Sequence, residues 1–582
     1  MEPQGGRRVH DLVIRGGSVV DGRGGPARTA DVAIRAGRIA EIARGVGRGR
    51  REIDADGLLV TPGWVDVHTH YDGQVSWDSQ LTPSCWHGVT TVVMGNCGVG
   101  FAPADPQRHD WLIRLMEGVE DIPGTALAEG IAWEWESFPE YLAAIGRRRY
   151  TLDVAAQLPH GALRAYVMGE RGADHTETPT RDEIETMARL AGEAVRAGAL
   201  GFSTSRTTNH RTRDGEFTPS LTAGEDELLG IARGLAKTGG GVFEAVADFR
   251  ERDRDAEFGL LERMVQVSGR PLSVSIAQAD AQADAWRDLL ARIDRAVARG
   301  LPMKAQVPVR AIGLMLGLSA SLHPFSSHPS YRQVASLPLG ERVARLRDPE
   351  LRARILAESP APGLGRLVFD FERIFSLGDP PDYEPAPDRS LAAEARGRGV
   401  EPAALAYERL LDDDGRALLY RPLLNYTEGN LDVTREMLLA PHTVPGLGDA
   451  GAHCGMICDG SFPTFLLAHW GRARTRGERL PVEWLVQRQA SDTARLVGLA
   501  DRGALEVGLR ADLNLIDLAN LRLEAPRIVH DLPAGGKRLL QGASGYVATV
   551  VGGEVTFECG EATGALPGRL VRGAREAHTI AH

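Results

Sequence analysis

The sequence predicts an α/β protein, specifically a TIM-like (β/α)8 barrel with a discontinuous β-sandwich domain formed by both termini. Apolar, β-rich runs alternate with helical patterns between residues 61 and 500, as parallel βα units require. Short runs of alternating apolar and polar residues predict strands in residues 8–60 and again after residue 500. The strands in each of these two regions need a partner sheet. The chain has 582 residues, 43% of them hydrophobic, so it can bury more than one core.

The two ends of the chain supply the predicted β-sandwich. Near the N-terminus, alternating runs predict strands at residues 11–15, 17–21, 31–35 and 38–42. Towards the C-terminus, residues 511–517 alternate in the same way, and residues 546–557 predict a hairpin around Gly552 and Gly553. We therefore expect residues 1–60 and 501–582 to form one domain, with the barrel between them at residues 61–500.

Eight apolar runs with intervening helical patterns predict the barrel strands. They are Trp64–His70, Thr90–Cys97, Asp153–His160, Leu200–Ser205, Gly241–Ala247, Pro271–Gln278, Leu301–Val309 and His442–Asp449. Two helices are predicted to begin with a Thr-x-x-Glu capping box, one at Thr180 with Glu183 and one at Thr222 with Glu225.

A long stretch, residues 311–420 approximately, interrupts this alternation. Its proline-rich piece Gly378–Pro387 cannot form regular structure. Such insertions commonly cover an active site and set its specificity, so we expect a lid-like insertion here.

The segment Thr61–His70 ends an apolar run in His68-x-His70. Residues two apart on a strand project to the same side, so both imidazoles converge on one point. Neutral imidazole is the commonest protein ligand for divalent transition metals, which predicts a metal site. The alternative interpretation is a pair of hydrogen-bonded histidines at a strand end.

Other polar residues fall at the same end of the predicted barrel. Active sites of such barrels lie at the carboxyl ends of the strands, where Cys97, His160 and Asp449 also lie in this interpretation. A thiolate at Cys97 would complete a zinc site, although a cysteine in a strand is usually a small apolar residue. Asp449 lies among small residues that let a ligand approach, and its alternative role is a turn or helix cap.

Four segments carry a resemblance to a known family. Thr61–His70 resembles the first barrel strand of the amidohydrolase superfamily, and His87–Gly98 resembles the second strand of its N-acyl-D-amino-acid deacylase (D-aminoacylase) branch. Pro159–Arg164 and Leu447–His453 agree with the same branch. The resemblance extends over nearly the whole chain.

The resemblance implies a divalent metal cofactor, with zinc favoured, and one or two ions. It implies that Cys97 binds metal in place of the carboxylated lysine of other amidohydrolases, and none of the three lysines (Lys237, Lys304 and Lys537) lies on the fourth candidate strand. It also implies that Asp449 binds metal, accepts the proton of the attacking water and passes it to the leaving amine.

The sequence departs from that family pattern on candidate strands five and six. The deacylases carry metal-binding histidines at the ends of these strands, and this chain has none there. Glu244, Asp248 or Gln278 are the possible substitutes, and each is equally a polar group at the edge of the core. The number of metal ions therefore stays open.

Four further residues are candidates for substrate binding. His160 is placed to bind a substrate carbonyl or an oxyanion, with a hydrogen bond to the backbone as its alternative. Arg164, Arg206 and Arg310 are candidates for pairing with a substrate carboxylate, although an arginine in so arginine-rich a chain is usually solvated or salt-bridged. His210, His323, His328 and His453 are left unassigned.

These observations favour a metal-dependent hydrolase of a linear amide, acting by resemblance on an N-acyl-D-amino acid to give a carboxylate and a free amino acid. The alternatives are a cyclic-amide hydrolase of the hydantoinase or dihydroorotase kind, and a non-catalytic binding protein on a degraded amidohydrolase scaffold. Both stay open at this point.

Composition limits the partners and the compartment. A net charge of -11 offers no basic surface for nucleic acid or an acidic membrane, so we expect a small-molecule substrate. The N-terminus has no apolar stretch, no later run is long enough to span a membrane, and five cysteines do not make a disulfide framework. We expect a cytoplasmic protein.

Overall fold

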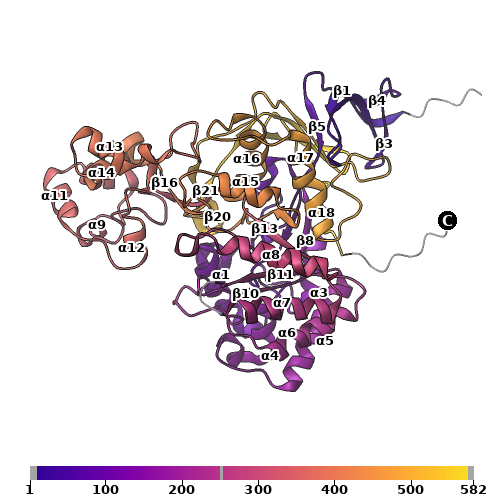
Figure 1. Ribbon diagram of the computed structural model, residues 1–582, viewed down its shortest axis with the longest axis horizontal. Coiled ribbons are helices and arrows are strands. Elements are labelled where there is room, and N and C mark those ends of the chain that lie inside the picture. The colour runs from indigo at the N-terminus through magenta and orange to yellow at the C-terminus, as the bar shows by residue number, and fades with distance from the viewer. Residues whose placement is uncertain (1–8, 250–252, 574–582) are drawn as a thin grey trace, which may run out of the picture.

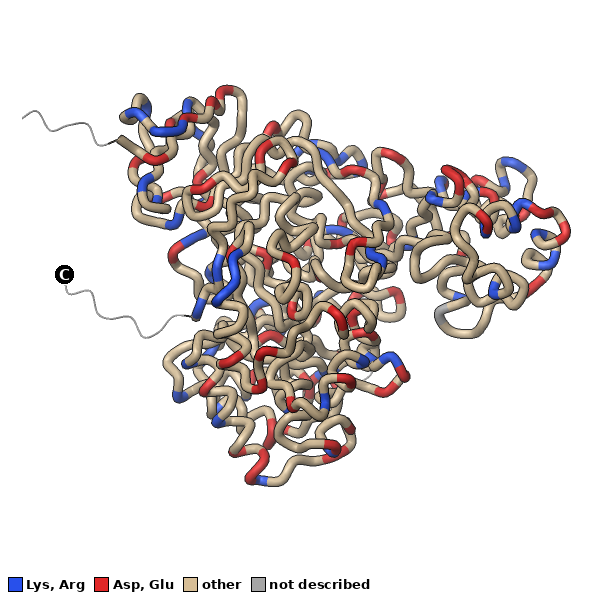
Figure 2. The backbone as a smooth tube through the Cα atoms, turned by 180° about the vertical axis from the view of Figure 1, so that it is seen from behind, with Lys and Arg blue, Asp and Glu red and all other residues tan. Residues whose placement is uncertain are grey.

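The computed structural model describes residues 9–249 and 253–573 as an α/β protein (Figure 1). Parallel strands and their helices make up the body of the molecule, a sheet of strands from both chain ends lies on one side, and a helical insertion projects from the other. Acidic and basic residues are interspersed along the whole backbone (Figure 2). None of the described helices is both long and apolar enough to cross a membrane.

The parallel strands form two sheets that adjoin one another. The first contains β6 (Trp64–Asp66), β7 (Val89–Met94) and β8 (Asp153–Ala156); the second contains β9 (Leu158–Pro159), β10 (Gly201–Arg206), β11 (Val242–Ala247), β12 (Leu272–Ser275), β13 (Met303–Val307) and β17 (Thr443–Pro445). Only Gln157 separates β8 from β9. A parallel bridge between Thr69 and Ala450 links the segment after β6 to the segment after β17.

Each of the eight candidate strands contains an observed strand, but several end earlier than expected. The strand β6 ends at Asp66, two residues before His68, and β7 ends at Met94, three residues before Cys97. His160 does not end a strand, because it is the first residue of α4 (His160–Met168). The polar residues predicted at strand ends therefore lie mostly in the loops that follow the strands.

Amphipathic helices cover the outside of the parallel strands (Figure 1). Among them are α5 (Arg181–Ala197), α6 (Glu225–Ala236), α7 (Arg254–Ser268) and α8 (Ala285–Ala298). The capping box of Thr180 and Glu183 is present at the start of α5. The predicted capping box of Thr222 is wrong: α6 begins later, with Gly224 as N-cap, and the Thr222 hydroxyl donates to the His175 carbonyl instead.

Strands from both chain ends share one nine-stranded sheet. Its order is β25 (Glu561–Ala562), β24 (Glu554–Glu558), β23 (Tyr546–Val551), β18 (Leu513–Ile516), β5 (Leu59–Pro62), β1 (His10–Val19), β2 (Arg28–Arg35) and β3 (Arg38–Ala43), with β4 (Gly49–Asp54) paired to β1. The two ends meet where β5 pairs antiparallel with β18, so that Thr61 lies opposite Asn514. Alternation places Val32, Val60 and Leu513 in one buried core.

Buried ion pairs join this sheet to the parallel strands. Arg502 and Arg510 both contact the Asp153 carboxylate of β8, at 2.7 Å and 3.0 Å, and Arg510 also contacts Asp512 at 3.1 Å. Removing one partner of such a set would leave a buried charge unpaired.

The insertion, residues 312–424, has a hydrophobic core of its own. Its base is the antiparallel pair β14 (Ile312–Leu316) and β16 (Leu419–Leu424), which also pairs with β15 (Phe375–Ser376). Helices α10 (Leu339–Leu346), α11 (Pro349–Ala357), α13 (Leu391–Arg398) and α14 (Pro402–Gly415) surround buried Phe325 and Tyr407. Figure 1 shows this insertion extending away from the body.

The proline-rich piece Gly378–Pro387 contains no strand or helix before η6 (Pro387–Arg389). It returns to the body of the molecule, where the Arg310 guanidinium lies 3.6 Å from the centre of the Tyr383 ring. Glu384 pairs with Arg474 and with His469, both at 2.9 Å. These contacts hold the piece against η8 (Leu466–Ala473) and the loop after it.

Candidate metal centre

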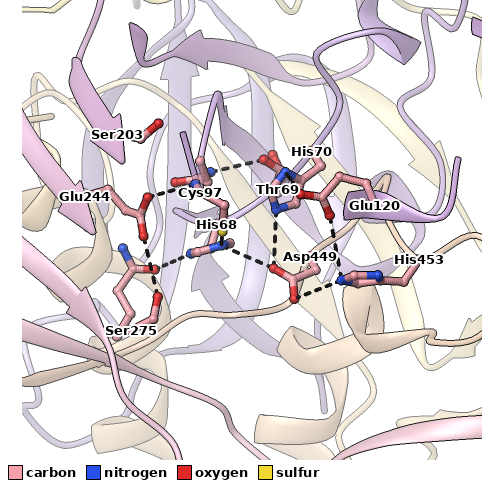
Figure 3. A network of polar contacts seen from close by, with 12 residues as sticks. His68, Thr69, His70, Cys97, Glu120, Ser203, Glu244, Ser275, Asp449 and His453 are labelled. Carbon is pink, nitrogen blue, oxygen red and sulfur yellow. Dashed lines mark hydrogen bonds and ion pairs between the residues drawn. The ribbon is translucent and has the colours of Figure 1, made fainter. Parts of the chain in front are cut away.

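Three side chains converge at the carboxyl ends of β6 and β7 (Figure 3). The ligand atoms of His68, His70 and Cys97 all lie within 4.8 Å of one another, and all three residues are buried. Nε2 of His68 is 3.3 Å from Sγ of Cys97. Among the described residues this is the one group of three metal-ligating side chains that meets this distance.

The loop after β7 holds the Cys97 thiol in place. Cys97 has a φ of 53°, in the left-handed region that costs a non-glycine residue about 1 kcal/mol or more. Its backbone amide donates to the Glu244 carboxylate at 2.9 Å, and the side-chain amide of the neighbouring Asn96 donates to the Thr69 carbonyl at 3.1 Å. A Cβ at Gly98 would lie 2.8 Å from the Ser205 nitrogen, so only glycine fits there.

A polar neighbour orients each imidazole. Nδ1 of His68 lies 2.8 Å from Oε1 of Gln306, and Nδ1 of His70 lies 3.3 Å from Oε1 of Glu120. Both rings therefore turn Nε2 towards the centre of the site. Metal-binding histidines typically present one ring nitrogen to the metal while the other contacts a carboxylate or carbonyl oxygen.

Asp449 completes the group from the loop after β17. Its Oδ1 lies 3.3 Å from Nε2 of His68 and 3.6 Å from Nε2 of His70. Its backbone nitrogen donates to the His68 carbonyl at 3.1 Å. The loop passes close to His70, because a Cβ at Gly451, whose φ is +96°, would lie 2.8 Å from the His70 carbonyl oxygen.

Burial and charge shift the pKa values of these groups. Burial lowers the pKa of His70 to about 4, so the ring is neutral at pH 7 and its nitrogens can bind metal. Burial, together with the charge of Glu244, raises the pKa of the Cys97 thiol well above its usual value. Burial also raises the pKa of Asp449, but the hydrogen bond to His70 and the charge of His68 outweigh it, so the pKa lies below its usual range.

The residues fit a divalent transition metal. His70 Nδ1 and Glu120 Oε1 are buried and lie 3.3 Å apart, but neither atom makes a hydrogen bond among the described residues. Two imidazoles and a thiol are the donor set that zinc prefers, with a carboxylate as a common further ligand. A cation at this point would stabilise the Cys97 thiolate, which burial alone disfavours.

The four residues predicted to bind substrate do not line the cavity beside this group. His160 contacts Glu227 at 3.1 Å, and Arg164 contacts the same carboxylate at 3.5 Å. Arg206 pairs with Glu257, and Arg310 pairs with Asp459 at 2.9 Å. Buried guanidinium groups need partners, and the folded chain supplies them internally.

Of the three substitutes considered for the missing histidines, Glu244 contacts the metal-ligating group, Asp248 lines the cavity beside it, and Gln278 does neither. Asp248 accepts hydrogen bonds from Thr207 and Thr208 at 2.6 Å. Gln278 binds Glu428 and Asn425 at the base of the insertion. Glu244 instead holds the Cys97 amide and lies next to the metal-ligating group (Figure 3).

Sequence reasoning missed three residues that structure the site. Glu120, the last residue of α1 (His109–Glu120), contacts His70 and His453. Gln306 on β13 contacts His68. His453 was noted without a role, and no spacing in the sequence connects these residues with the His68 segment.

A cavity of about 370 Å³ opens beside the metal-ligating group. The metal-ligating residues, Asp449, Glu120, His210 and His453 line its inner end. The rest of its wall is mostly apolar and comes from four elements and the loops near them: Phe249, Ile276, Trp286, Leu289, Ile312 and Leu424. Ile312 and Leu424 are the two ends of the insertion, so the insertion borders the cavity at its base.

Comparison with known proteins gives this arrangement a family context. The model of the family described as "Amidohydrolase family" matches residues 51–557. The D-aminoacylase of Alcaligenes xylosoxydans xylosoxydans is 27% identical to this chain, over 88% of this chain and 89% of that protein. The N-acyl-D-glutamate deacylase of the same organism is 29% identical, over 87% of each.

A solved structure has the same fold. The N-acyl-D-glutamate deacylase from Bordetella bronchiseptica, complexed with zinc and a phosphonate inhibitor, superimposes with a TM-score of 0.63. It is 24% identical and covers 97% of this chain and 100% of that chain.

Proposed function

The chain belongs to the amidohydrolase family, and we propose that it hydrolyses a linear amide, removing the acyl group of an N-acyl-D-amino acid to give a carboxylate and a free amino acid. The observation that carries this proposal is the convergence of His68, His70 and Cys97 beside Asp449 at the inner end of a cavity. Amidohydrolases act on amide bonds, and this enzyme class applies to the chain.

We infer that the parallel strands close into a TIM-like barrel of eight strands, in which β8 and β9 together count as one. Three pairings support this: β6 to β8 form one parallel sheet, β9 continues β8 after one residue, and the bridge between Thr69 and Ala450 joins the first strand to the last. In such a barrel the active site lies at the carboxyl ends of the strands. His68, Cys97 and Asp449 all follow those ends.

His68, His70 and Cys97 would hold a divalent metal ion, and we propose zinc. When bound, such an ion supplies Lewis acidity to an amide carbonyl and to water. The neutral His70 imidazole, the contact of His68 with Gln306 and the loop of Cys97, which Glu244 holds, fix the ligand atoms before any ion arrives. The zinc in the N-acyl-D-glutamate deacylase structure supports the choice of metal.

Asp449 is the proposed proton carrier. It lines the cavity, its carboxylate faces both histidines, and its lowered pKa keeps it ionised at neutral pH. An ionised carboxylate at this point accepts a proton from the attacking water and returns it to the leaving amine. Nε2 of His453 lies 4.0 Å from Oδ2 of Asp449.

The cavity wall supports a substrate with an apolar substituent. Part of its apolar surface comes from four side chains: Phe249, Ile276, Trp286 and Leu289. A substrate group that buries apolar surface against them gains about 25 cal/mol of favourable free energy per Å². The names of the two curated relatives support an N-acyl amino acid of D configuration. An uncharged, apolar acyl chain or side chain is the group that this wall accommodates best.

Amine release from a substrate panel tests the proposal. The panel contains N-acetyl-D-leucine, N-acetyl-L-leucine, N-acetyl-D-glutamate and a hydantoin, each with the zinc-loaded protein and with its Asp449→Asn variant. We expect amine from N-acetyl-D-leucine only with the wild type. Ring opening of the hydantoin instead would indicate a cyclic-amide hydrolase, and no product from any substrate would indicate a binding protein.

A further inference from the structure

A histidine in the loop after β10, His210, lines the cavity but does not belong to the metal-ligating group. Its ring is partly exposed, whereas His68 and His70 are buried. Nδ1 of His210 lies 2.9 Å from Oγ of Ser205, a residue near the end of β10. The other ring nitrogen, Nε2, makes no hydrogen bond among the described residues, so it is available to a ligand.

The Ser205 hydroxyl determines which ring nitrogen of His210 carries the proton. Ser205 is fully buried, and among the described residues its hydroxyl has no partner other than Nδ1 of His210. A buried hydroxyl group almost always donates a hydrogen bond, so this one donates to Nδ1. Burial, with His453 and His70 nearby, lowers the pKa of His210 to about 3, so the ring is neutral at pH 7 and carries one proton. That proton is therefore on Nε2, which makes Nε2 a hydrogen-bond donor.

Asp248, the residue after β11, fixes the turn that leads from β10 to His210. Its carboxylate accepts hydrogen bonds from Oγ1 of Thr207 and the backbone nitrogen of Thr208, both at 2.6 Å, and from Oγ1 of Thr208 at 2.7 Å. The Asp248 amide donates to the Arg206 carbonyl at 3.1 Å. Both carboxylate oxygens therefore have donors within the protein, and Asp248 holds the turn that carries His210.

A short hairpin, residues 211–217, follows His210 and holds it from the other side. The carbonyl of His210 accepts a hydrogen bond from the Thr218 amide at 3.4 Å, at the base of this hairpin. The hairpin packs tightly against α1, because a Cβ at Gly118 would lie 2.1 Å from the Arg213 nitrogen. The position of His210 is thus set by the chain on both sides of it.

The described lining of the cavity offers neither lysine nor arginine to a substrate carboxylate. The three arginines considered for this role, Arg164, Arg206 and Arg310, pair with carboxylates inside the fold. An N-acyl amino acid carries a carboxylate on the carbon next to its amide nitrogen. Neutral N–H groups can bind such a group, since a charged acceptor makes a hydrogen bond roughly twice as strong as a neutral one. The loop after β10 presents two neutral donors to the cavity, the His210 imidazole and the Asn209 amide.

We propose that His210 binds the carboxylate of the substrate through a hydrogen bond from Nε2, and that Ser205 and Asp248 position it. This inference rests on the proposed function, because it takes an N-acyl amino acid as the substrate. The carboxylate keeps its charge during hydrolysis, so the contact is equally strong in the ground state and in the transition state. Such a contact lowers KM and leaves kcat unchanged.

The experiment compares N-acetyl-D-leucine with N-(3-methylbutyl)acetamide, which has the same skeleton without the carboxylate. KM of the first compound and the inhibition constant of the second, used as a competitor, are measured with the zinc-loaded wild type and with His210→Leu. We expect His210→Leu to raise KM about 10- to 100-fold, because it removes a hydrogen bond to a charged group. Both kcat and the inhibition constant should stay within about three-fold of wild type. His210→Gln, whose side-chain amide can still donate, should recover most of the loss.

The matched control is His175→Leu. The His175 ring lies 5.3 Å from the ring of Phe217 in the same hairpin, but His175 is outside the cavity lining, so KM should not change. Ser205→Ala is a second variant, which keeps the test decisive if circular dichroism shows that His210→Leu does not fold. It removes the donor to Nδ1, so the ring proton is no longer confined to Nε2. KM should then rise about 3- to 10-fold, with kcat unchanged.

The outcomes separate this inference from the proposed function. If the wild type releases no amine from N-acetyl-D-leucine, the proposed function is wrong, and this inference is wrong with it. Amine release with an unchanged KM in the His210→Leu or, where that variant does not fold, the Ser205→Ala protein would overturn this inference alone. Equal increases in KM and in the inhibition constant would also overturn it, because they indicate a general disturbance of the cavity. So would a fall in kcat without a change in KM, which would place His210 at the reacting carbonyl.

Discussion

Gln306 holds His68 in the orientation that metal binding requires. The Gln306 amide nitrogen donates to Ser273 Oγ at 2.9 Å, so its carbonyl oxygen faces Nδ1 of His68, 2.8 Å away. Nδ1 therefore carries the proton, and Nε2 is left free beside Cys97. A residue on β13 thus determines which nitrogen of a histidine after β6 is available as a ligand.

The first prediction follows from that contact. Gln306→Met keeps the size of the side chain but removes the acceptor, so His68 loses its fixed tautomer. Removing the hydrogen-bond partner of a metal-binding histidine typically lowers metal affinity 10- to 100-fold. Competition with a chelator of known affinity should show a loss in that range. Gln489→Met, a buried glutamine of η9 (Arg488–Asp492) outside the cavity lining, is the control and should bind metal like the wild type.

The second prediction concerns the ligands themselves. Replacing both His68 and His70 with alanine removes two of the three donors of the central group. Elemental analysis of the purified variant should find the metal ion missing. The same double replacement at His442 and His530, which lie outside the cavity lining, should leave the metal content unchanged. Wild-type metal content in the His68/His70 variant would disprove the site.

The third prediction concerns Asp449. Asp449→Asn keeps the shape of the side chain and removes its capacity to accept a proton. General acid-base catalysis is typically worth about 10² to 10⁴-fold, so kcat should fall at least that far. If Asp449 were only a turn residue, the substitution would lower the free energy of unfolding by about 1 kcal/mol and leave kcat unchanged. Comparing kcat with the thermal unfolding midpoint distinguishes these roles, and a kcat within a few-fold of wild type would rule out the catalytic one.

The fourth prediction concerns the tether of the proline-rich piece. Burial raises the pKa of Glu384, but its hydrogen bonds with His469 and Arg474 outweigh this and lower the pKa to about 2. Because the folded pKa is below the ordinary value of 4.5, the ionised form stabilises the fold. That contribution is complete above about pH 5 and is lost as the pH falls towards 2.

Glu384→Gln should therefore destabilise the protein at pH 7 by about 3 kcal/mol, since it leaves the Arg474 guanidinium with Asp432 as its one ionic partner among the described residues. Urea unfolding of both proteins at pH 7 and pH 3 measures the difference. The difference in free energy of unfolding between the two proteins should be smaller at pH 3 than at pH 7. An equal difference at pH 7 and pH 3 would show that the charge of Glu384 does not contribute to the free energy of unfolding. Glu372→Gln, an exposed carboxylate of the same insertion paired with Arg396, serves as the control.

The sequence could predict the strands but not where they end. Hydrophobic runs locate β6 and β7 because burial in a parallel sheet demands them. The strands stop before His68 and Cys97, since loops that shape a site leave the regular ladder, and periodicity carries no information about such loops. Thr222 shows the same limit at a helix: its capping-box spacing is correct, but α6 begins later because the Thr222 hydroxyl binds the His175 carbonyl.

The candidate site was predictable where its residues lie in one short motif. His68 and His70 are two apart, and Cys97 and Asp449 occur in segments that resemble known ones. Glu120 and Gln306 come from a helix and a strand far away in the sequence, and only the fold brings them to the imidazoles. The alternative given for the arginines, a salt bridge, is what the structure shows for all three, but their partners Glu227, Glu257 and Asp459 could not be named in advance, because the sequence does not reveal how those segments pack.

The nine-stranded sheet cannot be completed until the end of the chain has been synthesised. During translation β1 to β5 leave the ribosome first, but β18, which pairs with β5, follows about 450 residues later. At synthesis rates of about 5–20 residues per second, the edge of β5 stays unpaired for tens of seconds. An exposed strand edge is a template for aggregation. The edge of β5 is therefore protected only once β18 has been made, and a fragment without β18 would leave that edge open permanently.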